Sequence, residues 1–60
     1  MLRPKLHDVV VEAGEPPAQW RIVDHWRDVF VLERLGEIHA RRFVYEDDLL
    51  DRSRYRAVAR

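Results

Sequence analysis

Few residues of this sixty-residue chain have a chemistry suited to nucleophilic catalysis. The chain holds no cysteine and no threonine, and its single serine, Ser53, stands within Asp51-Arg52-Ser53-Arg54. A catalytic hydroxyl is usually held on a strained strand-to-helix turn with glycine neighbours, which this segment lacks. The adjacent acids Asp47 and Asp48 are typical of a helix cap or a hydrated loop. The sequence therefore predicts no catalytic residues.

The possible metal ligands and phosphate-binding glycines are also isolated. His7, His25 and His39 have no recognised ligand spacing, and without cysteine a thiolate zinc site is excluded. Gly14 and Gly36 stand alone, so nothing resembles a phosphate-cradling glycine loop. The sequence predicts no metal and no cofactor.

The most unusual local feature is a run of arginines at the end of the chain. Residues 52–60 contain four arginines and no acid. In an extended strand, residues two apart share a face, and arginines there could contact a phosphate backbone while tyrosines stack on bases. Arginines of the expected preceding strand could join them. The candidate nucleic-acid-binding residues are Arg41, Arg42, Arg52, Arg54, Tyr55 and Arg56.

The net charge weakens that interpretation. Eleven basic and eleven acidic residues cancel, so the chain lacks the overall positive field that steers proteins toward nucleic acid. Acids at 46–48 and at Asp51 could neutralise the arginines as an ordinary solvated surface. A GC-rich coding sequence is the first explanation for the abundance of arginine, and the second is that arginine suits phosphate or carboxylate recognition.

The tryptophans offer a second candidate surface. Simple alternation places Trp20, Ile22, Asp24 and Trp26 on one face of a strand. Both indoles then pack in the core, or one forms an aromatic platform for a peptide or a second subunit. Asp24 on this face would lie near a barrel mouth or pair with an arginine such as Arg42. The candidate interaction residues are Trp20, Trp26 and Tyr45.

Short strands separated by turn residues must position these side chains. Strands are expected over 7–13, 19–26, 29–34 and 38–45, linked by Gly14–Pro17, Arg27-Asp28 and Leu35–Glu37.

The last quarter allows two interpretations. Residues 46–50 form a single 3₁₀ or helical turn before a fifth strand over 54–59, or a helix runs over 47–59. Leading acids and trailing arginines favour the helix, whereas the apolar residues make a poor helical stripe.

The predicted fold is mainly β: a small barrel of about five antiparallel strands, or alternatively a four-stranded curled sheet with that C-terminal helix. The segment Arg42-Phe43-Val44-Tyr45-Glu46-Asp47-Asp48-Leu49 is similar to the end of the fourth strand and the following turn in bacterial SH3-like barrels. The resemblance is topological and implies a fold shared by many functions. Residues 20–26 also look like a strand of plasmid-type dihydrofolate reductases, which share one site between four subunits, but Phe43 stands where that family has glutamine.

Length and composition indicate one domain over residues 1–60, with an ordered core over about 6–58. The apolar runs are too short to span a membrane or to act as a signal peptide, so a cytoplasmic location is expected. A core this small leaves self-association open as a source of stability. The predicted function is a non-enzymatic binding module that contacts DNA or RNA through its C-terminal strands. The alternatives are a protein adaptor or oligomer-forming subunit using the Trp20 and Trp26 face and, third, an enzyme site shared between subunits.

Overall fold

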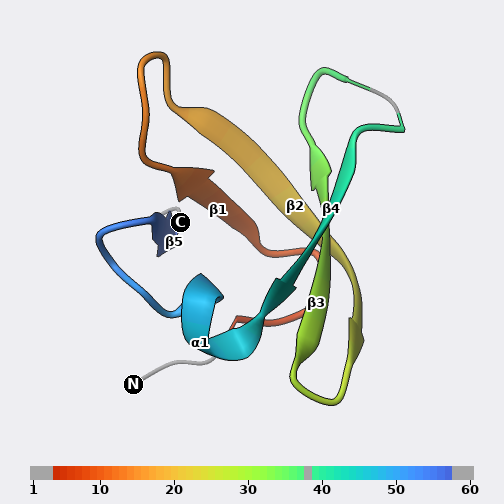
Figure 1. The fold of residues 1–60 in the computed structure, drawn as a ribbon. Helices are drawn as coiled ribbons and strands as arrows, with labels where there is room; N and C mark the ends of the chain where they lie inside the picture. Colours follow the sequence, from red (N-terminus) through yellow and green to blue (C-terminus); the bar gives the residue numbers. More distant parts are fainter. Residues whose placement is uncertain (1–3, 38, 58–60) are drawn as a thin grey trace.

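A computed structural model describes residues 4–37 and 39–57, which form five antiparallel strands and one short helix (Figure 1). The elements are β1 (Val9–Glu12), β2 (Ala18–Trp26), β3 (Val29–Arg34), β4 (Arg41–Tyr45), α1 (Glu46–Leu49) and β5 (Tyr55–Ala57). All strands belong to one sheet in the order β4-β3-β2-β1-β5. The prediction of a mainly β fold with five antiparallel strands is confirmed. The SH3-like resemblance stays a prediction.

The central strands and their turns follow the sequence pattern closely. β3 has the predicted bounds, and β2 begins one residue earlier than predicted. The β2–β3 hairpin turns at Arg27-Asp28, where Arg27 takes a φ of 55° in place of the glycine that such turns favour. Gly36, with a φ of 84°, lies in the predicted turn before β4.

β1 and β4 are shorter than the expected strands. His7 has a φ of 75° and His39 a φ of 73°, and a residue in that left-handed region cannot continue an extended strand. β1 therefore starts after His7, and β4 starts after His39 at Arg41. Ile38, the expected start of the fourth strand, lies outside the described residues.

The C-terminal quarter is a single helical turn followed by a strand, so the alternative helix over 47–59 is wrong. α1 ends at Leu49, whose side chain is buried. The Asp51 carboxylate then accepts hydrogen bonds from the main-chain N–H and the hydroxyl of Ser53, at 3.0 and 2.6 Å, which holds the chain in a turn. β5 pairs with β1, and Tyr55 is buried. The predicted fifth strand is confirmed over 55–57, and residues 58 and 59 lie outside the described part.

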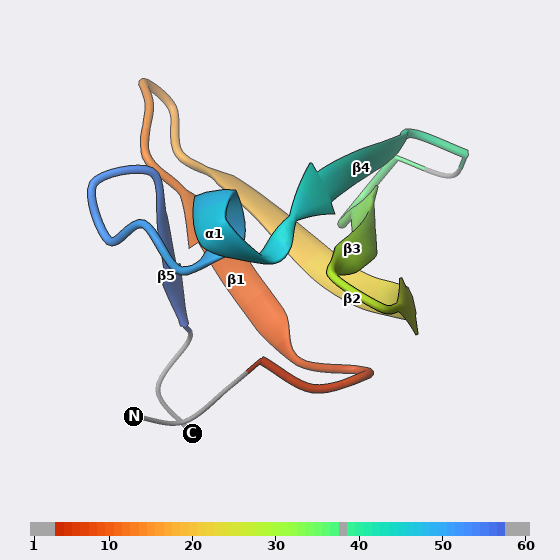
Figure 2. The same ribbon diagram turned by 60° about the horizontal axis from the view of Figure 1, so that its bottom comes forward.

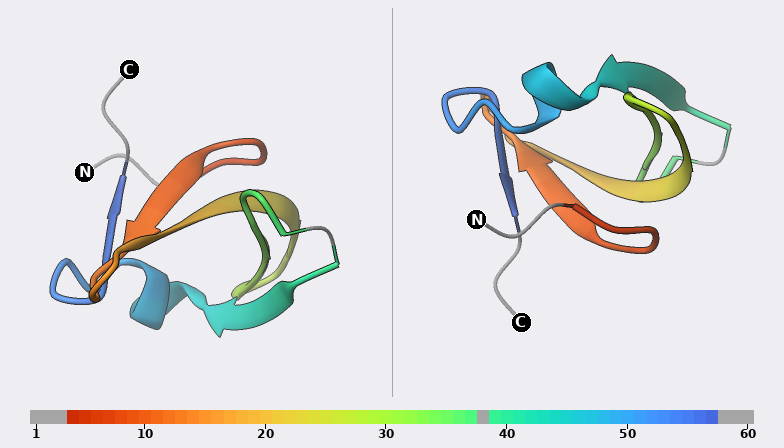
Figure 3. Two further views of the ribbon diagram at one scale, coloured as in Figure 1. Left: turned by 90° about the horizontal axis from the view of Figure 1, so that it is seen from above. Right: turned by 90° about the horizontal axis from the view of Figure 1, so that it is seen from below.

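The core fills the inside of a curled sheet. Figures 2 and 3 show the sheet curving so that α1 lies between β4 and β5 at its open side. The buried hydrophobic side chains come from every element: Val10, Trp20, Ile22, Phe30, Leu32, Val44, Leu49 and Tyr55. Among the described residues, no helix has the length and apolar character needed to cross a membrane.

Candidate binding surfaces

An irregularity in β2 separates the two tryptophans. Ile22 pairs with Leu32 and Asp24 pairs with Val31, so Val23 is an extra residue in β2, a β-bulge. Because side chains alternate with period two, one extra residue moves everything after it to the other face. Trp20 is therefore buried at 5% exposure, whereas Trp26 is 69% exposed. The expectation that both indoles share a face with Ile22 is wrong.

Trp26 instead joins two exposed aromatic residues of β4. Phe43 is 72% exposed and Tyr45 is 62% exposed. Through β3, Trp26 and Tyr45 both pair with Val29, while Phe43 pairs with Val31. Residues directly opposite in antiparallel strands lie on the same face. We name Trp26, Phe43 and Tyr45, together with the half-buried Val29 and Val31 between them, the aromatic face.

Charges of both signs surround the aromatic face. The Arg27 guanidinium lies over the Trp26 ring, 4.9 Å from its centroid. Arg41 donates from Nε to the Glu33 carboxylate at 3.2 Å. Asp24 is exposed, and its carboxylate accepts the main-chain N–H of His25 at 2.8 Å. Of the two alternatives expected for Asp24, the pairing with Arg42 is therefore wrong, because Arg42 bonds Glu12 and Tyr55.

Arg42 belongs to the interior of the curled sheet. Its guanidinium donates to the Glu12 carboxylate and, at 3.0 Å, to the Tyr55 hydroxyl, and it lies 4.4 Å from the centroid of the Trp20 ring. The Trp20 indole N–H donates to the same Glu12 carboxylate at 3.2 Å. The Tyr55 hydrogen bond raises the pKa of Arg42, and the Glu12 bond raises it further against the opposing effect of burial. We name Glu12, Trp20, Arg42 and Tyr55 the interior network.

The other arginine candidates do not form one surface. β4 and β5 lie at opposite ends of the sheet order, so Arg41 has no strand-pairing partner on β5. Residues 52–54 form a turn and not a strand, and Arg54 pairs with Asp48 at 3.2 Å. Of the six predicted nucleic-acid-binding residues, the structure brings together Arg42 with Tyr55, in the interior network, and Arg52 with Arg56.

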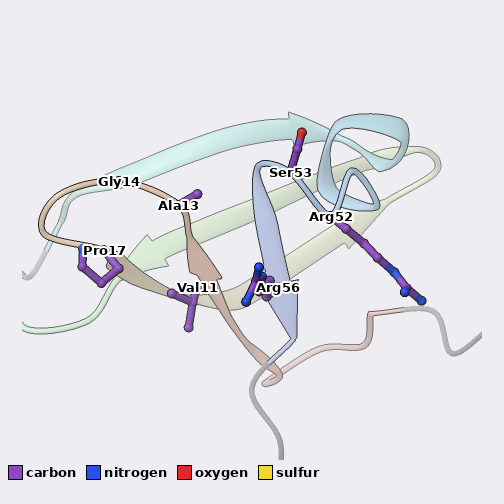
Figure 4. Close-up of a pocket in the computed structure, with 7 residues that line it drawn as sticks. All are labelled: Val11, Ala13, Gly14, Pro17, Arg52, Ser53 and Arg56. Atoms are coloured by element: carbon purple, nitrogen blue, oxygen red, sulfur yellow. The ribbon is translucent and has the colours of Figure 1, made fainter.

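Arg52 and Arg56 line a shallow depression beside β1 (Figure 4). Its remaining lining residues are Val11, Ala13, Gly14, Pro17 and Ser53. In Figure 4 the Arg56 side chain lies close to Val11, while Arg52 extends away from the other labelled side chains. Neither arginine forms an ion pair within residues 4–37 and 39–57.

His25 makes structural contacts through its ring. His25 stacks on Phe30 with ring centroids 4.0 Å apart, and its Nε2 lies 2.6 Å from the Arg27 carbonyl oxygen. In the described part of the chain, no group of three histidine or acidic residues is placed to hold a metal ion. Sequence reasoning left Phe43 out of the interaction surface, although alternation along β4 already placed it on the same side as Tyr45.

Comparisons with protein-family models, with curated proteins and with solved structures each gave no match.

Proposed function

We propose that this chain is a non-enzymatic binding module that docks a partner protein on its aromatic face. The observation that carries the proposal is the joint exposure of Trp26, Phe43 and Tyr45. At these exposures, three aromatic side chains present roughly 300–500 Å² of surface. That area matches the largest apolar patch of a typical monomer, and such patches often mark interaction sites.

The charge distribution favours a protein over a nucleic acid at this face. Interface cores are enriched in tryptophan, tyrosine and phenylalanine, with charged residues at the rim. Here Arg27 and Arg41 are balanced by Asp24 and Glu33. Phosphate binding depends on excess positive charge, which the rim lacks. Binding at this face therefore depends on contact with the aromatic rings and not on attraction to a charged partner.

The spacing of the rings suits an extended segment that carries proline or aliphatic side chains. Phe43 and Tyr45 lie two residues apart on β4, which is about 7 Å along a strand. Same-side residues of an extended peptide repeat at that distance. Proline and aliphatic side chains pack well on flat aromatic rings, and Trp26 extends the platform across β3.

The test begins with a photo-crosslinking amino acid placed at Phe43, with the exposed Ser53 as the control position. A protein that is captured only from position 43, and that is not a second copy of this chain, is purified, and its affinity is measured for the wild type, Trp26→Ala and Arg52→Ala. Loss of an interface tryptophan is expected to weaken binding by roughly thirtyfold. Arg52→Ala is expected to bind like the wild type. Equal binding by Trp26→Ala, or equal capture from Ser53, contradicts the proposal.

Nucleic acid is a second candidate partner, at a different surface. The favouring observation is that Arg52 and Arg56 line the same depression without an ion-pair partner in the described part of the chain. Anisotropy of a labelled thymidine oligonucleotide at low salt tests it. The double variant Arg52→Glu, Arg56→Glu is expected to lose binding, whereas Arg41→Ala retains it. An oligonucleotide that does not bind the wild type at low salt excludes this candidate.

A further inference from the structure

The outer edge of β4 is a second surface, distinct from the aromatic face. β4 ends the sheet order and pairs only with β3. One hydrogen bond lies just beyond each end of the β3–β4 pairing. The Arg34 N–H donates to the Ala40 carbonyl at 2.9 Å, and the Glu46 N–H donates to the Asp28 carbonyl at 2.7 Å. Hydrogen-bonded positions alternate along an antiparallel strand, so on β4 they are the even-numbered residues.

The main chain of the odd-numbered residues therefore points away from β3. These residues are Arg41, Phe43 and Tyr45, and no hydrogen bond among the described residues uses their outward N–H groups. The carbonyls of Arg41 and Phe43 are equally unused, while Tyr45, as the N-cap, has its carbonyl engaged by α1. The edge offers three donors and two acceptors to another strand.

We propose that a second copy of this chain pairs with this edge, β4 against β4, antiparallel about a two-fold axis at Phe43. In that register Phe43 lies opposite the second copy's Phe43, and their main chains exchange two hydrogen bonds. The Tyr45 N–H donates to the second copy's Arg41 carbonyl, and the symmetric bond makes a total of four. The edge is self-complementary because each of its two free acceptors meets a free donor of the second copy.

The side chains are complementary in the same register. Phe43 meets its own counterpart, and the Arg41 guanidinium faces the second copy's Tyr45 ring, a favourable cation–π pairing. All of these side chains lie on the aromatic face, so pairing joins the two faces into one continuous surface. Trp26, on β2, stays outside the seam. The inference goes beyond the proposed function because the edge uses main-chain groups that partner docking on the rings does not need.

Two usual protections of an edge strand, a proline and a β-bulge, are absent from β4. Natural edges carry prolines, bulges or unpaired charges that prevent strand addition. β4 has no proline, and its register with β3 has no bulge. Its two arginines are both engaged within the chain, Arg41 by Glu33 and Arg42 by Glu12. Two copies therefore meet without a repulsive cluster of free guanidinium groups.

A seam of five residues is short, so the dimer is expected to be weak. Stable specific interfaces bury about 800 Å² on each partner. Sedimentation velocity of the full chain over a wide concentration range is therefore the appropriate measurement. The wild type is expected to shift from monomer to dimer with rising concentration.

Matched variants at Phe43 test the main-chain pairing. Both Phe43→Ala and Phe43→Pro remove the ring, but only proline removes the N–H, and an edge strand tolerates proline where the N–H faces outward. Phe43→Pro is expected to associate roughly tenfold or more weakly than Phe43→Ala, because two hydrogen bonds are lost. Equal association of the two variants, or a wild type that stays monomeric throughout, overturns the proposal.

Amide hydrogen exchange of the wild type gives a readout that does not depend on how a variant folds. Exchange at Phe43 and Tyr45 is expected to slow as concentration rises, with the turn residue Arg52 as an unchanged control. Concentration-independent exchange at Phe43 and Tyr45 overturns the proposal. Trp26→Ala separates this inference from the proposed function, since it is expected to leave the dimer unchanged while losing the partner protein.

Discussion

Arg42 and Glu12, thirty residues apart in the chain, form an ion pair that joins β4 to β1. β3 and β2 lie between these strands in the sheet order, so the pair spans the inside of the curled sheet and not a neighbouring strand. Tyr55 on β5 and Trp20 on β2 contact the same guanidinium. The interior network therefore connects four of the five strands and engages the Arg42 guanidinium within the chain.

Removing Glu12 is expected to destabilise the fold more than removing a surface acid. Glu12→Ala leaves both Arg42 and the Trp20 indole without their carboxylate, which costs about 1–3 kcal/mol of unfolding free energy. Arg42 stays 40% exposed, so solvent screening places the loss toward the lower end. Glu33→Ala, which breaks only the exposed pair with Arg41, is expected to cost less than about 1 kcal/mol. Urea unfolding compares the two, and equal losses would show that the network adds nothing.

The two tryptophans are expected to report on different parts of the molecule. Trp26→Phe removes the exposed, readily quenched fluorescence and changes stability by about 0.5 kcal/mol or less. Trp20→Phe removes the buried emission together with the hydrogen bond to Glu12, and costs about 1–3 kcal/mol. Acrylamide quenching of each single-tryptophan protein checks this. A Trp20 quenched as easily as Trp26 contradicts the burial described above.

The two glycines give a matched pair for backbone strain. Gly36 has a φ of 84°, so Gly36→Ala forces an alanine into the left-handed region and is expected to cost about 1 kcal/mol. At Gly14 a methyl group would meet only the Pro16 carbonyl oxygen, at an ordinary contact distance of 3.6 Å. Gly14→Ala is therefore expected to leave stability unchanged or slightly raised. Thermal unfolding of both variants is the measurement, and the prediction fails if Gly14→Ala is the more damaging.

Acid is expected to weaken the turn before β5. The hydrogen bonds from Ser53 lower the pKa of Asp51 below its ordinary value of 3.8 in the folded chain. A carboxylate with a lowered folded-state pKa contributes stability that is fully present above the unfolded value and disappears as pH falls through the folded value. Asp51→Asn is thus expected to be less stable than the wild type at neutral pH, with the difference shrinking below about pH 4. A difference that is constant with pH would assign the effect to geometry and not to charge.

The sequence predicted the sheet well because its signals are local. The residue pattern predicted a strand over 29–34, and β3 has these bounds. The turn before β4 was predicted from Gly36, because glycine takes positive φ at little cost. The helix-or-strand choice after Tyr45 was open, since charge pattern favoured a helix. In the structure Leu49 of α1 and Tyr55 of β5 both lie in the core, which a short helix followed by a turn and a strand allows.

By itself the sequence determined a mainly β domain and its first four strands, because alternation and turn residues are readable along the chain. Only the tertiary structure decided which side chains are exposed together on one face. The extra residue Val23 reverses the face of Trp26, and no periodicity marks where a bulge falls. Likewise, the sequence does not distinguish Arg42 from Arg41, since both are arginines of the same strand. Only the curled sheet brings Glu12 and Tyr55 into contact with Arg42. The aromatic face and the open edge of β4 come from strand pairing, and pairing is a property of residues distant in sequence.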